Sequence, residues 1–190
     1  YLSLAALASQ SGVKRTHLLD RQVDGALLLE LFTRDGLGTL VTEESYDQIC
    51  QATIEDVNGI IELITPLEQQ GILVRRSRER LELEIAYFTL MKRDGMTIAC
   101  AALYPHPEAN IAEFACLAVH PDYRREGRGD TLLAAIEQQA LALHIPRLFV
   151  LTTQATHWFL ERGFQPAALE VLPPQRRSLY NYQRNSRVFL

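Results

Sequence analysis

The chain has few cysteines, no excess of basic residues and no long apolar run, and each shortage excludes a class of protein. Its three cysteines, at positions 50, 100 and 116, lie far apart among 190 residues and form no CxxC pair. Neither a disulfide framework nor a zinc knuckle has that spacing, so we expect a protein of a reducing compartment. The 19 Lys and Arg residues stand against 23 Asp and Glu residues, a net charge of −4. Without a bulk positive field, a nucleic-acid partner is disfavoured.

The apolar residues occur in short runs. None of these runs approaches the ~20 residues that cross a bilayer, and the first residues lack the basic-then-apolar layout of a signal peptide. We therefore expect a soluble, cytoplasmic protein with no membrane partner. The five histidines show no ligand spacing such as HExxH, so we expect no metal site.

Charge is distributed unevenly along the chain. Seven acidic residues and no Lys or Arg occur from Glu43 to Gln70, whereas four arginines and no acid occur from Val171 to Leu190. Two further basic groups cover 75–80 and 124–128. Most single arginines are simply solvated. Three separate basic groups in an acidic protein still indicate a small anionic ligand, because guanidinium groups hold carboxylate and phosphate well.

The spacing of apolar residues predicts an α/β domain. Two apolar segments, 85–92 and 96–103, flank Arg93-Asp94-Gly95, and Asp-Gly between two apolar strands is typical of a tight hairpin. An antiparallel meander that leads into a strand, helix, strand unit forms a mixed, mostly antiparallel sheet with flanking helices. The other elements expected here are strands over 48–53, 110–119, 147–152 and 180–189 and helices over 55–68, 130–144 and 155–162.

The first 42 residues are expected to form a separate short unit. The pattern predicts a helix over 1–11, a strand over 13–19 and a further helix or strand over 25–32. So few elements cannot bury a sizeable core of their own. We therefore place a domain boundary near residue 42, with the main domain over 43–190.

A basic loop with two glycines lies between an expected strand and an expected helix. Arg124-Arg125-Glu126-Gly127-Arg128-Gly129 can turn its backbone amides toward one point, where the helix dipole favours negative charge. Gly127 and Gly129 would let a pyrophosphate approach the backbone, and the arginines would add charge at the rim. A dinucleotide-binding GxGxxG motif would need glycine in place of Leu132, and no Lys-Ser or Lys-Thr follows as in a P-loop. By itself the loop also fits an ordinary turn and helix cap.

Several segments together resemble one family. The strand AEFACLAVHPDY, the loop RREGRG, the helix after it, the strand LFVLTT and the ending WFLERGF are similar to the GNAT (GCN5-related N-acetyltransferase) family over roughly residues 43–190. The resemblance implies the GNAT fold and binding of the acetyl-CoA pyrophosphate at R/Q-x-x-G-x-G/A, with acetyl-CoA as co-substrate. The cofactor-binding positions that it implies are Leu117, Val119, Arg124, Arg125, Glu126, Gly127, Arg128, Gly129 and Asp130.

A narrower resemblance lies within that family. DQICQATIEDVNGI, EFACLAVHPDYR, THWFLERGF and YNYQRNSRVF are similar to the bacterial N-acetylglutamate synthases, a family of amino-acid N-acetyltransferases. GVKRTHLLDRQVDGALLLELFTRDGLGT resembles the end of the amino acid kinase-like domain that precedes the acetyltransferase in those enzymes. Residues 1–42 would then be a remnant of that domain. The resemblance further implies a homo-oligomer for the full-length protein and inhibition by arginine bound to the kinase-like domain.

The resemblance implies acetyl transfer to the α-amine of L-glutamate, the first step of arginine biosynthesis. A protonated amine cannot attack a thioester. Glu113, inside an otherwise apolar strand, is the candidate proton acceptor because partial burial raises the pKa of a carboxyl group. Glu113 equally fits a strand residue that reaches solvent or a structural arginine. Simple alternation places Glu113 and Cys116 on opposite faces, so the strand must bulge if both line the site.

Further site residues are implied by the same resemblance. Cys116 matches a cysteine near the reacting centre, but a free cysteine also fits a small buried hydrophobe, so direct attack by the amine is preferred. A backbone N–H near Leu117 would stabilise the oxyanion if the strand bulges. Thr152 matches a hydroxyl residue that assists the leaving thiol, since Phe159 replaces the tyrosine acid of many family members. The glutamate-contacting positions that it implies are Arg76, Arg184 and Ser186.

Two other functions stay open. The chain also fits an acetyltransferase of another amine, or a catalytically weak acetyl-CoA-binding regulatory module. Glu113 and the Arg184-x-Ser186 tail favour the enzyme of glutamate, because a pure binding module needs neither.

Overall fold

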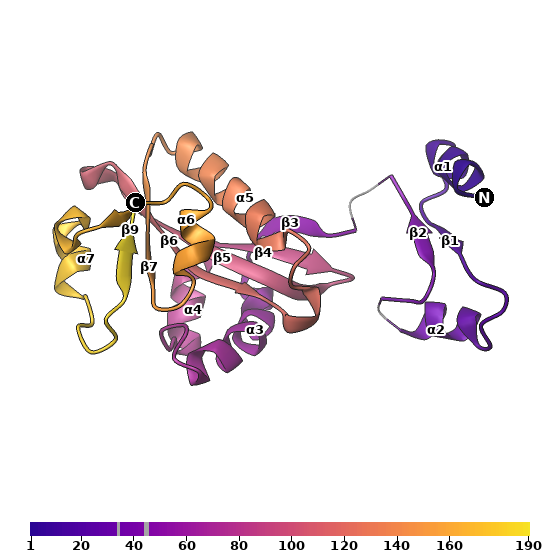
Figure 1. Ribbon diagram of the computed structural model, residues 1–190, viewed down its shortest axis with the longest axis horizontal. Coiled ribbons are helices and arrows are strands. Elements are labelled where there is room, and N and C mark those ends of the chain that lie inside the picture. The colour runs from indigo at the N-terminus through magenta and orange to yellow at the C-terminus, as the bar shows by residue number, and fades with distance from the viewer. Residues whose placement is uncertain (34, 44–45) are drawn as a thin grey trace. The chain divides into compact units, whose positions relative to one another are not determined.

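The computed structural model describes residues 1–33, 35–43 and 46–190, which form two compact units, Tyr1–Gln48 and Ile49–Leu190. Figure 1 labels their helices and strands. The smaller unit contains the helices α1 (Leu2–Gln10) and α2 (Ala26–Phe32) and an antiparallel pair of strands, β1 (Thr16–Leu18) and β2 (Thr39–Val41).

The smaller unit buries little of itself. Among its described residues only Ala5, Ser9 and Ala26 are buried. Eight of its large apolar side chains on the two helices are exposed: Leu2, Leu4, Leu7, Leu27, Leu28, Leu29, Leu31 and Phe32. An apolar surface of this kind is what a packing partner normally covers.

The larger unit is built on one sheet with the strand order β3-β4-β5-β6-β7-β9-β8. Strands β6 and β7 pair in parallel, whereas the pairs β4–β5, β5–β6, β7–β9 and β8–β9 are antiparallel. This mixed sheet confirms the expected fold class. The strands are β3 (Gln48–Gln51), β4 (Phe88–Arg93), β5 (Met96–His106), β6 (Ile111–Val119), β7 (Leu148–Thr152), β8 (Pro166–Ala167) and β9 (Arg187–Phe189).

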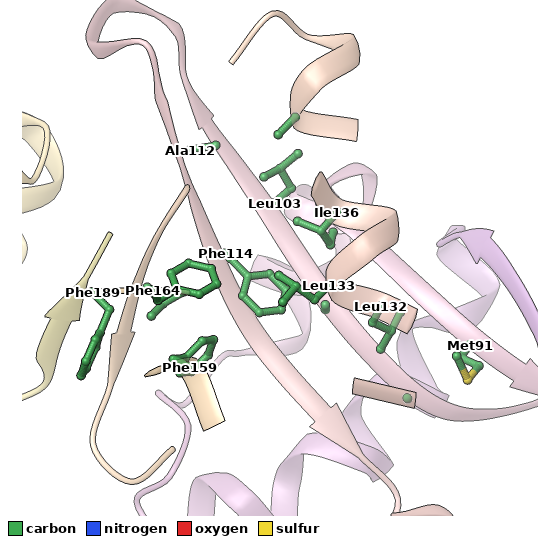
Figure 2. Packing of buried hydrophobic residues seen from close by; sticks show 14 of the residues in the cluster. Met91, Leu103, Ala112, Phe114, Leu132, Leu133, Ile136, Phe159, Phe164 and Phe189 are labelled. Carbon is green, nitrogen blue, oxygen red and sulfur yellow. The ribbon is translucent and has the colours of Figure 1, made fainter. Parts of the chain in front are cut away.

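Helices cover both faces of the sheet (Figure 1). Successive residues of β5 point to opposite faces: Ala101 belongs to the core that includes α5, and Ala102 to the core that includes α3. Figure 2 shows the α5 side, where Phe114 of β6 and Ile136 of α5 lie in one cluster. The helices are α3 (Val57–Gln69), α4 (Arg78–Glu84), α5 (Arg128–Ala142), α6 (Thr156–Leu160) and α7 (Pro174–Ser178).

The hairpin and the long helices agree with the sequence-based expectations. Asp94 and Gly95 have φ angles of 45° and 77°, which are the left-handed values that a tight two-residue hairpin requires. The helix expected over 55–68 is α3, and the one expected over 130–144 is α5, which begins two residues earlier at Arg128. Both carry apolar residues at helical spacing over several turns, the strongest local signal a sequence offers.

Two expected strands are shorter in the structure. The one expected to begin at residue 85 begins at Phe88, because Ile85–Tyr87 form a 3-10 turn after α4. The one expected over 180–189 is only Arg187–Phe189. The side chain of Asn181 accepts hydrogen bonds from the amides of residues 183 and 184, which holds a turn where a strand was expected. In the described part of the chain, no helix is both long enough and apolar enough to cross a membrane.

Candidate active site

A bulge in β6 brings two candidate residues to one cavity. The register joins Ala102 to Ala115 and Cys100 to Ala118, so Cys116 and Leu117 have no partner on β5. Cys116 has φ of 54°, an uncommon value for a residue other than glycine. Because the bulge breaks the alternation of side chains, Glu113 and Cys116 line the same cavity. The condition derived from the sequence is therefore met.

The cavity has a volume of about 470 Å³ and is lined by β5, β6, α4, α7 and the loops that follow α3 and α7. It contains the three positions expected to bind glutamate, although they come from segments more than 100 residues apart. Its lining residues are Ile72, Leu73, Val74, Arg76, Arg80, Glu84, Tyr104, His106, Glu113, Ala115, Cys116, Leu151, Arg176, Leu179, Tyr180, Asn181, Arg184 and Ser186.

Both carboxylates of the cavity are already bound. Arg176 of α7 donates from Nε and Nη2 to the two oxygens of Glu113, at 2.5 and 3.0 Å. Glu84 accepts from Nε of Arg80 at 2.8 Å and from the hydroxyl of Tyr104 at 2.6 Å. The Glu113 side chain thus has the structural arginine that the sequence left as an alternative, and both of its oxygens are engaged.

Arg76 and Arg184 have no carboxylate partner among the described residues. Arg76 donates from Nη1 to the carbonyl oxygen of Val74 at 3.1 Å, and Arg184 donates from Nη2 to that of Ile72. The Nε atom of each is buried without a hydrogen-bond partner. Unpartnered buried donors are costly, so two half-buried guanidinium groups beside the bulge indicate an anionic ligand.

Neighbouring groups shift the pKa values of these side chains. Burial lowers the pKa of Arg184, and the nearby charges of Arg76 and Arg176 lower it further. Burial also opposes the charge of Arg76, but the Cys116 thiol and the Tyr104 hydroxyl outweigh it and raise its pKa. The pKa of the Cys116 thiol is lowered, first by its hydrogen bond with Cys100 and also by Arg76, against the effect of burial.

The loop before α5 has the backbone conformation expected of an anion cradle. Arg125 and Gly127 have φ of 69° and 74°, and α5 begins at the next residue, Arg128. A Cβ atom built on Gly127 would meet nothing within 4 Å, so its backbone faces open space. The first amides of a helix are unsatisfied donors at the positive end of its dipole. The residues present therefore fit a pyrophosphate.

One arginine of this loop, Arg128, differs from the expectation of charge at the rim, whereas Arg124 and Arg125 are exposed. Arg128 is buried, where its Nη1 donates to the carbonyl oxygen of Tyr123 at 2.9 Å and to Glu126 at 2.6 Å. Arg124 donates from Nε to the carbonyl oxygen of Val119 at 3.1 Å. Internal acceptors hold the guanidinium group of Arg128, whereas that of Arg124 stays exposed. Arg128 can thus offer a ligand its backbone amide, not its charge.

Helix α6 supports the start of α5. A Cβ on Gly129 would lie 3.2 Å from the Trp158 ring, so a larger residue here would require the ring to move by a few tenths of an ångström. Arg162 stacks over Trp158 at 3.9 Å and forms an ion pair with Asp130. The carboxylate of Asp130 is thus engaged by Arg162. Phe159 is buried against Phe114 in the core and supplies no hydroxyl.

Strands β6 and β7 pair over a short stretch. The parallel register joins Ala112 to Leu148 and Glu113 to Phe149. Beyond that point, the β7-facing edge of β6, including Leu117 and Val119, has no register partner in β7. Thr152 ends β7 outside the cavity lining, and its hydroxyl oxygen accepts a hydrogen bond from the Ala155 amide at 3.0 Å. The structure therefore does not bring Thr152 into the cavity with Glu113.

Comparison with known proteins identifies the family. Residues 59–164 match the family model described as "Acetyltransferase (GNAT) family". The chain belongs to the GNAT family. It is 58% identical over all 190 residues to an amino-acid acetyltransferase of Serratia proteamaculans, and 59% identical over the same length to one of Yersinia enterocolitica. It spans 43% of the length of each of these relatives.

Solved structures give the same fold. N-acetylglutamate synthase from Neisseria gonorrhoeae, complexed with coenzyme A and N-acetyl-glutamate, matches with a TM-score of 0.74 and 46% identity, over 99% of this chain and 45% of that one. The same enzyme complexed with coenzyme A and L-arginine matches with a TM-score of 0.84 and 43% identity, over 99% and 43%. The GNAT fold and the resemblance to this group of acetyltransferases are thus confirmed.

Several residues of the GNAT site were not expected from the sequence. Glu84, Tyr104 and His106 line the cavity without having been singled out as site residues, and Arg176 was expected only as one of the four arginines over 171–190. The Arg80–Glu84 pair at i,i+4 was a readable signal for α4. His106 was expected to be an ordinary surface or core histidine, and it lies beside Glu113. Among the residues that the structure describes, no group of His, Cys, Asp and Glu could hold a metal ion.

Proposed function

We propose that this chain transfers the acetyl group of acetyl-CoA to the α-amine of L-glutamate, the first step of arginine biosynthesis. The observation that carries the proposal is the pair Arg76 and Arg184, two half-buried guanidinium groups without carboxylate partners beside the β6 bulge. A dicarboxylic amino acid supplies the anionic groups that these side chains lack. The names of the relatives and the ligands of the solved synthase structures support the same substrates.

Acetyl-CoA would bind along β6 and at the start of α5. The amides of residues 125–130 would hold the pyrophosphate, at the position where the helix dipole favours it. The edge of β6 at Leu117 and Val119 is not paired with β7, so its backbone groups could hydrogen-bond to an extended pantetheine chain. An added strand would pair with the same groups. When bound, acetyl-CoA supplies an activated thioester next to the bulge.

Arg76, Arg184 and Ser186 would hold the carboxylates of glutamate. The Tyr180 hydroxyl donates to the Ser186 carbonyl oxygen at 2.6 Å, which ties the tail segment in place. The backbone N–H near Leu117, where the bulge leaves β6 without a register partner on β5, would stabilise negative charge on the acetyl oxygen. Direct attack forms the N–C bond and breaks the C–S bond. Coenzyme A leaves as a thiolate, which takes up a proton to become the thiol, and the attacking amine loses a proton.

Glu113 would accept that proton, directly or through a water molecule. Arg176 occupies one lone pair on each oxygen, so a second lone pair remains to take the proton. Arg176 would thus keep Glu113 in position before the substrate arrives. Cys116 lines the same cavity and would contact the acetyl group there. Direct attack by the amine does not require Cys116 as an acyl carrier. Thr152 would act from the end of β7, outside the cavity.

Initial rates of coenzyme A release test the proposal. We expect activity with L-glutamate and little with L-glutamine, which lacks the side-chain carboxylate. Arg184→Ala should raise the glutamate KM roughly 10- to 100-fold, because a hydrogen bond to a charged group is lost. Arg187→Ala is the matched control, since Arg187 is exposed on β9 and does not line the cavity. Equal rates with other amines would indicate a different acetyltransferase, and bound acetyl-CoA without any turnover would indicate a binding module.

We also propose that the smaller unit is the end of an amino acid kinase-like domain, and that the longer protein forms a homo-oligomer. The relatives are more than twice as long as this chain, and the match extends through residue 1. The exposed leucines of α1 and α2 support contacts with further chain or with a second copy. Sedimentation of the longer protein beside this chain tests the assembly: a monomeric longer protein would contradict the proposed homo-oligomer.

A further inference from the structure

The wall of the Glu113 cavity has more positive than negative side chains. Four guanidinium groups, of Arg76, Arg80, Arg176 and Arg184, face two carboxylates, of Glu84 and Glu113. Each carboxylate is hydrogen-bonded to one arginine, so the excess of two charges belongs to Arg76 and Arg184. These two are also the groups whose buried Nε atoms have no partner. The ligand that completes this wall therefore bears two negative charges.

The other polar groups of the wall do not reverse this balance. The hydroxyls of Tyr104 and Tyr180 are uncharged donors to Glu84 and to Ser186. Burial lowers the pKa of His106, which keeps its ring neutral. Behind the wall, the carboxylate of Glu68 accepts the backbone amide of Arg76 without lining the cavity. Even if Glu68 is counted, an excess of one positive charge remains.

An ammonium group has no suitable position in such a cavity. The α-amine of an amino acid is mainly protonated at neutral pH, and its partner would have to be a carboxylate. Glu84 and Glu113 are both engaged by arginines, and the remaining charges repel a cation. The same wall suits both carboxylates of glutamate and disfavours its ammonium group. Electrostatic selection of this kind favours the amine form that can react, at a cost in substrate affinity.

We propose that this cavity binds dicarboxylates of similar length that lack an ammonium group more tightly than it binds the amino acid, and that they compete with the amine substrate. The proposal rests on the proposed function only in placing glutamate in this cavity. It assigns a second class of ligand, inhibitory dicarboxylate anions, to the same arginines. Glutarate, which is glutamate without its amine, is the simplest member of the class.

Titration calorimetry on the whole chain, saturated with coenzyme A so that no acetyl group is present, tests the proposal. At pH 7 we expect the Kd of glutarate to be about tenfold lower than that of L-glutamate, the scale of one screened charge interaction. At pH 9 the ratio should shrink, because glutamate begins to lose its ammonium proton. Titration of protein groups such as Cys116 affects both ligands, so it largely cancels in the ratio.

Variants assign the effect to the arginines. Arg184→Gln should weaken glutarate binding about tenfold and reduce the preference over glutamate, whereas Arg184→Lys should retain much of that preference. Arg177→Gln is the matched control, since Arg177 is exposed on α7 next to Arg176 and does not line the cavity. Far-ultraviolet circular dichroism verifies that each variant is folded, and Arg76→Gln replaces Arg184→Gln if the latter is not.

The outcomes separate the two proposals. If glutamate binds as tightly as glutarate at pH 7, the preference for amine-free dicarboxylates is refuted while the proposed function stands. If glutarate binds tightly and no amino acid is acetylated, the ligand class is supported and the proposed function fails. If neither dicarboxylate binds, the charge argument itself is wrong.

Discussion

Under the proposed function, Glu113 would serve both as the anchor of Arg176 and as the proton acceptor. Its carboxylate is held at both oxygens by Arg176, and it lies next to the bulge where an amine would be deprotonated. A bidentate guanidinium contact fixes the carboxylate in space. Each carboxylate oxygen has a second lone pair, so it can accept a proton while Arg176 stays bound. Under the proposed function, Arg176 is therefore a positioning residue for Glu113.

Replacing Glu113 by Gln separates these roles. Glu113→Gln keeps the size of the side chain but removes the proton acceptor, so kcat at neutral pH should fall by ~10²- to 10⁴-fold. The glutamate KM should change much less, because Arg76 and Arg184 are retained. Steady-state kinetics over pH 6 to 9 measures both constants. A variant with the turnover of the wild type across that range would show that Glu113 only anchors Arg176.

At this scale the sequence predicted some contacts and not others. Glu113 and Cys116 are three positions apart in one strand, so they can face the same side only if the strand bulges. The structure contains this bulge, and Cys116 adopts a left-handed φ of 54° in it. Arg176 lies 63 positions from Glu113. No local pattern connects two residues at such a separation; only the chain's tertiary path places α7 over β6. The inward-facing Arg128 was missed because a charged side chain in a basic loop is normally solvated.

At the scale of elements, the loop before α5 depends on a left-handed glycine. Gly127 precedes the helix with φ of 74° and its α-carbon faces open space. A β-branched residue disfavours this conformation and would extend into the path of a bound pyrophosphate. The neighbouring Gly129 has a different duty, since it admits the ring of Trp158. The two glycines of one motif thus serve a ligand and a helix contact separately.

Gly127→Val should weaken the binding of coenzyme A at least tenfold, measured by titration calorimetry. The matched control is Gly95→Val, because Gly95 has φ of 77° and also meets nothing within 4 Å, but lies in the β4–β5 hairpin. Both variants carry the backbone strain of a left-handed residue, on the order of 1–2 kcal/mol. Only Gly127→Val should lose affinity. Equal affinity in the two folded variants would contradict the cradle.

Elements with long repeating patterns were the ones the sequence predicted well. The periodic helices α3 and α5 and the Asp-Gly hairpin match their expected places. Helix α4 was missed because seven residues with one buried leucine carry little pattern, although Ser77 caps it by accepting the Arg80 amide. The strand expected over 180–189 was too long because the turn at Asn181 depends on a side-chain hydrogen bond.

At the scale of the whole molecule, the smaller unit relies on one carboxylate. Glu30 of α2 accepts the amides of Leu37 and Gly38 at 2.7 and 2.8 Å and pairs with His17 of β1. These contacts, led by the Gly38 amide, lower the pKa of Glu30 to about 2. A carboxyl group with a depressed pKa stabilises the folded unit fully above its ordinary value of 4.5 and loses that effect as the pH falls toward 2.

Acidification from pH 5 to pH 2 should therefore open the smaller unit through Glu30. The protection factors of the amides of residues 37 and 38 against hydrogen exchange, taken relative to the intrinsic rate at each pH, should fall over this interval. Glu30→Gln should show fast exchange already at neutral pH, because a neutral amide holds the two N–H groups less strongly. Asp24→Asn, an exposed site in the same unit, is the control and should exchange as the wild type does. Unchanged protection in Glu30→Gln would show that the loop is held by other contacts.

The last prediction concerns arginine, which the family resemblance assigns as an inhibitor that acts through the kinase-like domain. Allostery requires two sites with coupled states, and this chain aligns with less than half of the relatives' length. Within the larger unit, the cavity wall bears an excess of positive charge at Arg76 and Arg184, which repels a cationic amino acid. Arginine should therefore neither compete with glutamate nor lower kcat in the 190-residue chain. Initial rates with and without millimolar arginine measure this directly. Competitive inhibition would refute the charge argument for the cavity, whereas noncompetitive inhibition with arginine bound to this chain would place an effector site within these residues.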